Sequence, residues 1–309
     1  MTSKQIKLGH LGALLTISIW ATTFASTKVL LEDFTPVEIM FYRFAVGYIA
    51  LLVIRPRFIK YRSIGEEVLF MAAGICGVSI FYLFQNTALT YTFASNSAVL
   101  MSVSPLFTAL ITHYLLKTET LRPSFFAGFA VSMTGIALIG FNGNFVLELN
   151  PLGDILSVLC AFVWAVYSLI IRKISDQNYD NILVTKKVFF YGLIFMLPLL
   201  PLFGFETGLE RFASMPNLLN MLFLGLAASA VCYMTWNYAL KVLGAVKTSV
   251  YIYVIPVMTI VISATVLQEK ITLVAAAGAI LILSGLYLSE RKPAARQRID
   301  GHTTSSPDA

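Results

Sequence analysis

The stretch YLFQNTALTYTFASNSAVLMSVSP, residues 82–105, is similar to a second stretch of this chain, YMTWNYALKVLGAVKTSVYIYVIP, residues 233–256. In each copy an asparagine stands 19 residues before the closing proline, and a glutamate follows that proline after 14 or 13 residues. Upstream of each copy, a tryptophan stands 23 residues before a basic residue. Agreement at this many spacings predicts two homologous halves.

The composition excludes a soluble globular protein. Of the 309 residues, 58% are hydrophobic and 12% are charged, and the mean hydropathy is +0.79. Soluble domains have about 45–50% apolar and about 25% charged residues. A spanning helix needs about 20 largely apolar residues, so the apolar runs predict an all-α polytopic membrane protein with ten transmembrane helices. These runs lie at residues 11–31, 36–54, 67–88, 94–116, 123–141, 152–171, 183–204, 217–239, 245–267 and 271–289.

Five helices in each half determine how the two halves are related. A chain that crosses the membrane five times ends on the opposite side, so the second half runs inverted. Inverted repeats are a recurrent architecture of transporters, with the substrate site between the halves. We expect a first repeat at residues 11–141, an external linker at 142–151, a second repeat at 152–289 and a disordered cytoplasmic tail at 290–309.

The basic residues are divided unequally between the two predicted sides. Sixteen Lys and Arg residues fall on one side, and only Arg211 and Lys270 fall on the other. Because basic loops stay in the cytoplasm, we expect both termini there. This placement accounts for the net charge of +6 without a nucleic-acid partner.

Several motifs resemble the EamA-type members of the drug/metabolite transporter superfamily. They are SIWATTFASTK at 18–28, TPVEIMFYRF at 35–44, AFVWAVYSLIIRK at 161–173, and the two echoing stretches quoted above. The resemblance implies a bacterial inner-membrane carrier with ten helices that exports amino acids or other small metabolites. It also implies a central cavity between the repeats, walled mainly by the first, third, fourth, sixth, eighth and ninth helices.

Aromatic and polar residues at matching positions are the first candidates for a substrate site. Trp20 and Trp164 stand midway along the first helix of each half, where they either wall a cavity and sort substrates by size or pack the helices together. A second group in the third helix of each half either binds substrate or joins helices through hydrogen bonds. This group consists of Tyr82, Gln85, Asn86, Tyr233, Trp236 and Asn237.

Arg43 and Lys187 are basic residues inside the second helix of each half. One interpretation is that they attract an anionic group of the substrate, such as a carboxylate, from opposite sides of the membrane. The other is structural, with bonds to carbonyl groups or, for Lys187, extension to the cytoplasmic surface. No carboxylate falls in the central part of a run, so we expect none to neutralise either residue. The same absence favours facilitated diffusion or exchange over proton coupling.

Prolines and glycines recur at matching positions in the later helices. Pro105 and Pro256 interrupt the fourth and ninth helices, either as hinges or as static kinks. Paired glycines in the fifth and tenth helices permit close contact, within one protomer or between two. We expect a monomer or a weak homodimer.

No pattern of residues indicates an enzyme, a metal site or a cofactor, since there is no paired-acid centre, His–Asp cluster, phosphate loop or metal-ligand spacing. The leading hypothesis is a secondary transporter in the lipid bilayer that exports amino acids or related zwitterions by alternating access. One alternative is an exchanger or importer of a larger anionic or drug-like solute. An alternative of a different class is a membrane receptor or scaffold that transports nothing.

Overall fold

The structure is a computed structural model that describes residues 2–92, 94–117, 123–140, 150–258 and 273–290. Every secondary-structure element in these residues is a helix. Most of the predicted linker at 142–151 and nearly all of the predicted tail at 290–309 lie outside the described residues.

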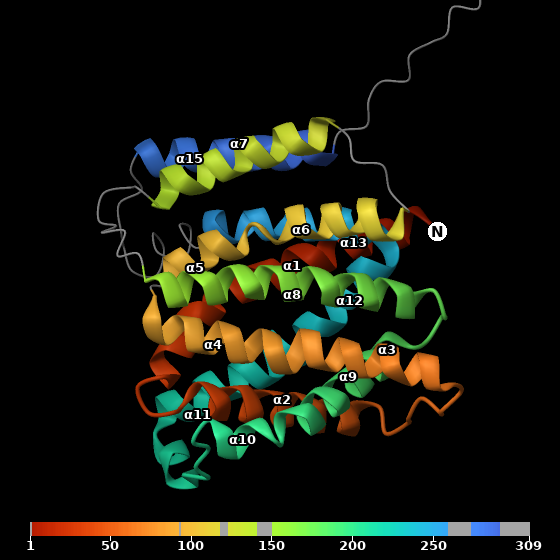
Figure 1. Ribbon diagram of the computed structural model, residues 1–309, viewed down its shortest axis with the longest axis vertical. Coiled ribbons are helices and arrows are strands. Elements are labelled where there is room, and N and C mark those ends of the chain that lie inside the picture. Colours follow the sequence, from red (N-terminus) through yellow and green to blue (C-terminus); the bar gives the residue numbers. More distant parts are fainter. Residues whose placement is uncertain (1, 93, 118–122, 141–149, 259–272, 291–309) are drawn as a thin grey trace, which may run out of the picture.

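Consecutive helices run back and forth, and several are divided by short π- or 3₁₀-helical segments (Figure 1). In chain order the elements are α1 (Ser3–Leu30), α2 (Pro36–Ile54), α3 (Ile64–Gly74), η1 (Ile75–Ile80), α4 (Phe81–Tyr91), α5 (Ala94–Met101), α6 (Ser104–Ile111), η2 (Thr112–Leu116), α7 (Pro123–Gly140), α8 (Pro151–Ser175), α9 (Asn181–Met196), α10 (Leu199–Leu202), η3 (Leu209–Ala213), α11 (Met215–Leu222), η4 (Phe223–Val231), α12 (Cys232–Leu243), α13 (Ala245–Ser249), η5 (Val250–Tyr253) and α15 (Leu273–Glu290).

Among the described residues, five helices are long and apolar enough to cross a membrane. They are Ser3–Leu30, Pro36–Ile54, Ile64–Tyr91, Pro151–Ser175 and Met215–Leu243. Shorter apolar helices occur at Pro123–Leu138, Ala245–Met258 and Ala276–Ser289. The chain is therefore a polytopic membrane protein, while the full number of ten spans stays a prediction.

Side-chain caps explain where several helices begin. Thr2 and Thr35 each form a capping box with the residue three positions later, and proline follows Thr35 as the first residue of α2. Asn150 and Asp180 accept a backbone N–H at the start of α8 and α9. These caps satisfy N–H groups that have no partner inside the helix.

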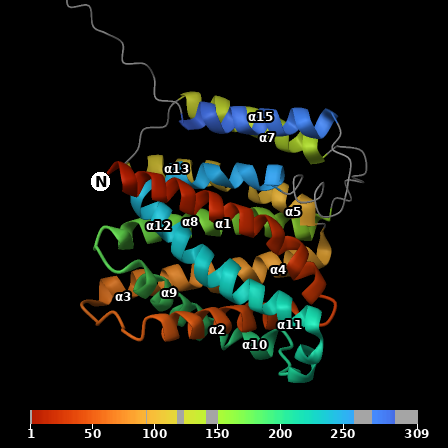
Figure 2. The same ribbon diagram turned by 180° about the vertical axis from the view of Figure 1, so that it is seen from behind.

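The helices extend between two ends of different charge (Figures 1 and 2). The end that holds the N-terminus and residues 55–63 carries Arg55, Arg57, Lys60 and Arg62, and we name it the basic end. The opposite end, named the acidic end, holds residues 31–35 and 203–214, with four acidic residues and Arg211.

The third helix of each predicted half contains the same irregularity. The π-helix η1 joins α3 to α4, and the longer π-helix η4 joins α11 to α12. When Asn86 is aligned with Asn237, η1 falls on residues 226–231, which lie inside η4. This correspondence supports a duplicated chain.

Both predicted hinge prolines follow a local break in helical geometry. Residues 102 and 103 separate α5 from α6, and Pro105 stands in the first turn of α6, where its missing N–H breaks no helical bond. In the second half, the 3₁₀-helix η5 directly precedes the helical turn that contains Pro256. The helix is therefore interrupted just before each proline. Movement about these interruptions stays a prediction.

The two halves pack against each other in a reciprocal way. A Cβ added to Gly74 in α3 would lie 2.6 Å from the backbone nitrogen of Gly192 in α9. At the position equivalent to Gly74, a Cβ added to Gly225 in η4 would lie 2.7 Å from Cβ of Val46 in α2. The third helix of each half therefore packs closely on the second helix of the other half.

Helices α7 and α15 form a separate pair at one edge of the molecule (Figures 1 and 2). A Cβ added to Gly128 would lie 2.5 Å from the carbonyl oxygen of Gly285, and one added to Gly135 would lie 2.5 Å from that of Gly278. The paired glycines thus serve a contact within one chain.

Candidate functional site

Three tryptophans meet at the centre of the helices. Trp20 of α1 lies with its ring centroid 5.1 Å from that of Trp164 of α8 and 5.2 Å from that of Trp236 of α12. The rings of Trp164 and Trp236 are 6.1 Å apart. The equivalent tryptophans therefore contact each other directly, and Trp236 completes a cluster that we name the tryptophan cluster.

Tyrosine rings extend the tryptophan cluster on one side. Tyr233 lies 5.8 Å from Trp164, centroid to centroid, and 6.3 Å from Trp20. Tyr82 belongs to the same core and packs 4.8 Å from Phe44 of α2. Helices from both predicted halves thus contribute to one aromatic centre.

A small cavity adjoins the cluster. Its volume is about 40 Å³, and Trp20, Tyr82, Gln85 and Trp164 are among the residues that line it. Such a volume holds only a few water molecules. The aromatic rings would have to separate before a metabolite could enter.

The cluster contains polar hydrogens with different surroundings. Trp20 Nε1 donates a hydrogen bond to the carbonyl oxygen of Ala228 at 3.0 Å. The Nε1–H groups of Trp164 and Trp236 are buried and have no hydrogen-bond partner within the described residues. A buried donor without a partner is costly, and an indole nitrogen can only donate. The cluster is therefore suited to a ligand with acceptor atoms.

Arg43 lies beside this aromatic centre and is 2% exposed. Its Nε donates to Ser229 Oγ at 3.0 Å, and its guanidinium carbon stands 4.2 Å from the ring centroid of Tyr82. Its Nη2 has no hydrogen-bond partner among the residues that the structure describes. Arg43 is thus a buried cation held by a hydroxyl group and an aromatic face, with donor capacity left over.

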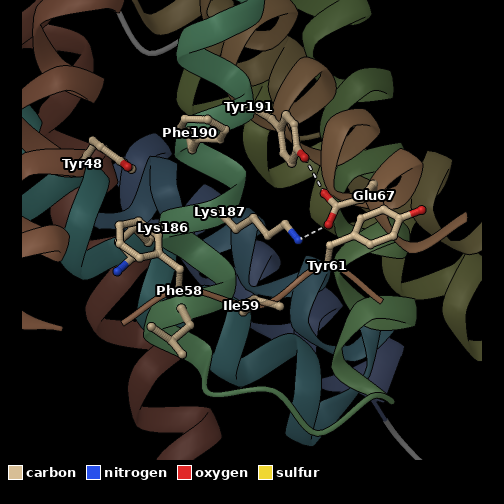
Figure 3. Close-up of a pocket in the computed structure, with 10 residues that line it drawn as sticks. Tyr48, Phe58, Ile59, Tyr61, Glu67, Lys186, Lys187, Phe190 and Tyr191 are labelled. Atoms are coloured by element: carbon tan, nitrogen blue, oxygen red, sulfur yellow. Dashed lines mark hydrogen bonds and ion pairs between the residues drawn. The ribbon is translucent and has the colours of Figure 1, made fainter. Parts of the chain in front are cut away.

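Lys187 does not share the surroundings of Arg43. Its Nζ lies 2.5 Å from Glu67 Oε1, and Tyr191 donates a hydrogen bond to the other oxygen of the same carboxylate (Figure 3). The expectation that no carboxylate neutralises Lys187 was therefore wrong. Glu67 begins a predicted run, and it reaches Lys187 because α3 packs on α9 near the basic end.

The two asparagines mainly join helices. Asn237 accepts a hydrogen bond from Tyr167 at 2.8 Å and donates one to Thr185 at 3.1 Å, so both of its amide atoms link neighbouring helices. Asn86 donates to the carbonyl oxygen of Pro36 at 3.0 Å, and its own carbonyl oxygen has no partner within the described residues.

Sequence reasoning missed the residues that position the two cations. The contact of Ser229 with Arg43 could not be predicted, because a single serine in an apolar run is common and indicates no particular partner. Glu67 was visible, but its pairing with a residue 120 positions away depends on how the halves pack. In the described part of the chain, no group of three His, Cys, Asp or Glu side chains could hold a metal ion.

Comparison with known protein families identifies the family of this chain. The model of the EamA-like transporter family matches residues 7–141 and again residues 151–291. The chain belongs to the EamA-like transporter family. It is therefore a transporter and not an enzyme.

Relatives of similar length are named as transporters. An uncharacterized transporter of Archaeoglobus fulgidus is 31% identical over 287 residues, covering 92% of this chain and 97% of the relative. A probable terminal-alkyne amino-acid exporter of Streptantibioticus cattleyicolor is 25% identical, covering 92% and 94%. A solved structure matches with a TM-score of 0.70 at 20% identity, over 94% of this chain and 97% of that one, which shows a similar fold alone.

Proposed function

We propose that this transporter exports amino acids or related zwitterions across the bacterial inner membrane. In this proposal it is a secondary transporter whose two inverted halves open in turn to either side of a central site. The tryptophan cluster, Tyr82, Tyr233, Gln85 and Arg43 form that site. The basic end faces the cytoplasm, as the distribution of Lys and Arg favours.

The main support for the proposal is a set of hydrogen-bond donors, around a buried aromatic centre, that have no partner within the described residues. Arg43 Nη2 and the Nε1–H groups of Trp164 and Trp236 offer hydrogens to an acceptor, and none of the described carboxylates forms an ion pair with Arg43. A substrate carboxylate is the acceptor that would match a guanidinium. Electron-rich rings attract a substrate ammonium group. An amino acid carries both groups.

The similarity to a probable amino-acid exporter supports the same class of substrate. The small cavity supports a compact substrate, because a larger solute would require a wider separation of the rings.

Arg43 gives the proposal a direct test in liposomes. We expect the wild-type protein to transport leucine faster than leucinamide, which lacks the carboxylate. Replacing Arg43 with Gln should lower kcat/KM for leucine by about 10–100-fold, since hydrogen bonds to charged groups contribute about 1.5–3 kcal/mol. Transport of leucinamide should change little.

Two further variants keep this test interpretable. Lys28→Gln removes one positive charge from α1 outside the site and should leave both rates near wild type. Trp164→Phe keeps an aromatic ring but removes the Nε1–H donor, and should lower leucine transport by about fivefold. Equal loss of both substrates in folded Arg43→Gln protein would refute the carboxylate role.

A further inference from the structure

A second, larger pocket lies near the basic end, between α2, α9 and residues 55–63 (Figure 3). Its volume is about 370 Å³, within the range of about 300–1,000 Å³ that is typical of ligand pockets. It is separate from the tryptophan cluster, and none of the residues that line the central cavity lines it.

Exposed apolar side chains occur on both helices that border this pocket. On α9, Phe190 lines the pocket and is 43% exposed, and Ile194, one turn later, is 40% exposed. On α2, Ile49 and Val53 follow the lining residue Tyr48 and are 58% and 77% exposed. In a polytopic membrane protein, exposed apolar side chains along helices face acyl chains. An occupant therefore reaches the pocket from the bilayer.

The rim is basic and aromatic. Residues 55–62, RPRFIKYR, contain four basic residues and no acidic one. Lys186 of α9 fixes this loop beside the pocket, because its Nζ donates to the carbonyl oxygens of Arg55 and Arg57 and lies 4.3 Å from the Phe58 ring centroid. Phe58 and Tyr61 are more than half exposed, as is common for aromatic residues at a membrane interface.

The pocket continues inward from this rim. Tyr191 stands ten residues after the first residue of α9, which is about 15 Å along a helix at about 1.5 Å per residue. The inner walls carry the rings of Tyr48 and Phe190 beside the Lys187–Glu67 ion pair (Figure 3). A molecule that fits is charged at the end near the rim, and the rest of it lies against aromatic rings and the mutually neutralised Lys187–Glu67 pair.

We propose that this pocket binds one anionic phospholipid from the leaflet at the basic end. Arg57, Lys60 and Arg62 are exposed and stand next in sequence to the lining residues Phe58, Ile59 and Tyr61. In this proposal they contact the phosphate, while an acyl chain lies against Tyr48 and Phe190. Basic residues beside a membrane attract anionic headgroups. Free phosphate does not use the apolar walls, so it binds far more weakly. This site is independent of the proposed substrate.

Native mass spectrometry of the full-length protein in detergent can measure this binding. Titration with phosphatidylglycerol should show one lipid bound at least tenfold more tightly than phosphatidylcholine. The double variant Arg57→Gln/Lys60→Gln should weaken phosphatidylglycerol binding at least fivefold. The control Lys241→Gln/Lys247→Gln removes two positive charges from α12 and α13, outside the pocket, and should weaken this binding less than twofold.

The apolar part of the pocket needs its own variant. Leu183 lines the pocket and is partly exposed, and Leu183→Trp should fill the space and weaken phosphatidylglycerol binding without any change of charge. Normal melting temperatures would show that the variants are folded. Equal weakening by both double variants, equal binding of the two lipids, or binding of inorganic phosphate as tight as that of lipid would overturn the proposal.

Discussion

At the residue scale, the centre of the molecule combines large aromatic rings with a cation that forms no ion pair with any of the described carboxylates. Arg43 is almost fully buried, and the cost of keeping an uncompensated cation in a membrane is several kcal/mol at least. The contacts with Ser229 and the Tyr82 ring offset part of that cost. In the proposed function, a transported anion supplies the remaining compensation.

The tryptophan pair should set the size of the substrate. Replacing Trp20 or Trp164 with Ala removes a ring from a centroid contact of 5.1 Å and enlarges a cavity of about 40 Å³. We expect the ratio of phenylalanine to alanine transport in liposomes to rise by about tenfold, because the wider site admits a bulky side chain. Trp20→Phe should change the ratio less. Unchanged ratios in folded protein would indicate that the pair only packs helices.

Spacing alone indicated that Trp20 and Trp164 are equivalent, and the structure brings them together. It could not indicate that Trp236 completes the cluster, since its place depends on how α12 crosses α1 and α8. The ion pair of Lys187 could not be predicted from the sequence either, because its partner Glu67 belongs to the other predicted half. Residue spacing in the sequence reveals equivalent positions in the two halves. Contacts between the halves depend on how the helices pack, which spacing does not reveal.

At the element scale, several helices meet through close contacts that only glycine allows. The α7–α15 pair is the clearest case, and a Cβ added to Gly285 would lie 2.5 Å from the carbonyl oxygen of Gly128 and 2.2 Å from Ser132 Oγ. Backbone atoms cannot move aside as a flexible side chain can.

Gly285→Ala should therefore force the two helices apart. We expect a loss of about 1–3 kcal/mol, as for other overpacked sites, seen as a lower melting temperature in detergent. Gly65→Ala in α3 is the matched control, since within the described residues no atom beyond its chain neighbours and its own helix backbone lies within 4 Å of a Cβ added there. A melting temperature of Gly285→Ala equal to that of the control would contradict the close packing of α7 on α15.

A hydrogen bond between halves at the basic end predicts a dependence on pH. Tyr179, in the turn between α8 and α9, donates to the buried carboxylate of Glu66, and partial burial together with this bond raises the pKa of Tyr179 to about 12 from its usual 10. The folded state holds this proton more tightly than the unfolded state, so its stabilising effect is complete below pH 10 and is lost as the pH rises to about 12.

Melting temperatures measured between pH 8 and pH 12 can test this dependence. Tyr179→Phe should melt at a lower temperature than wild type at pH 8 and should lose less stability across the alkaline range. The exposed Tyr114 supplies the control variant Tyr114→Phe, which should follow the wild-type curve. Parallel curves for Tyr179→Phe and wild type would mean that the bond to Glu66 contributes nothing.

At the scale of the whole molecule, the predicted duplication would account for several separate features. The family match occurs twice, at residues 7–141 and 151–291. The π-helices η1 and η4 correspond, and each third helix packs on the second helix of the other half. An odd number of helices in each half would make the two halves inverted copies, which could open to opposite sides with similar energies.

The proposed topology can be checked with reporter fusions. A fusion after Leu149 should give a signal for the external side, and a fusion at the C-terminus should give a cytoplasmic signal, because five helices separate the two positions. Fusions after Arg57 and after Lys241 test the basic end and should both report the cytoplasm. The same signal from Leu149 and from the C-terminus would rule out inverted halves.

Counterflow in liposomes can show whether the protein carries amino acids through a site that contains Arg43. Vesicles with the wild-type protein, loaded with unlabelled amino acid, are diluted into a trace of the labelled form, and accumulation requires a carrier that exchanges one molecule for another. We expect transient accumulation of at least one neutral amino acid, which is absent in empty vesicles and about tenfold or more lower with Arg43→Gln. Absence of counterflow across the whole panel, with folded protein in the vesicles, would contradict the proposed function.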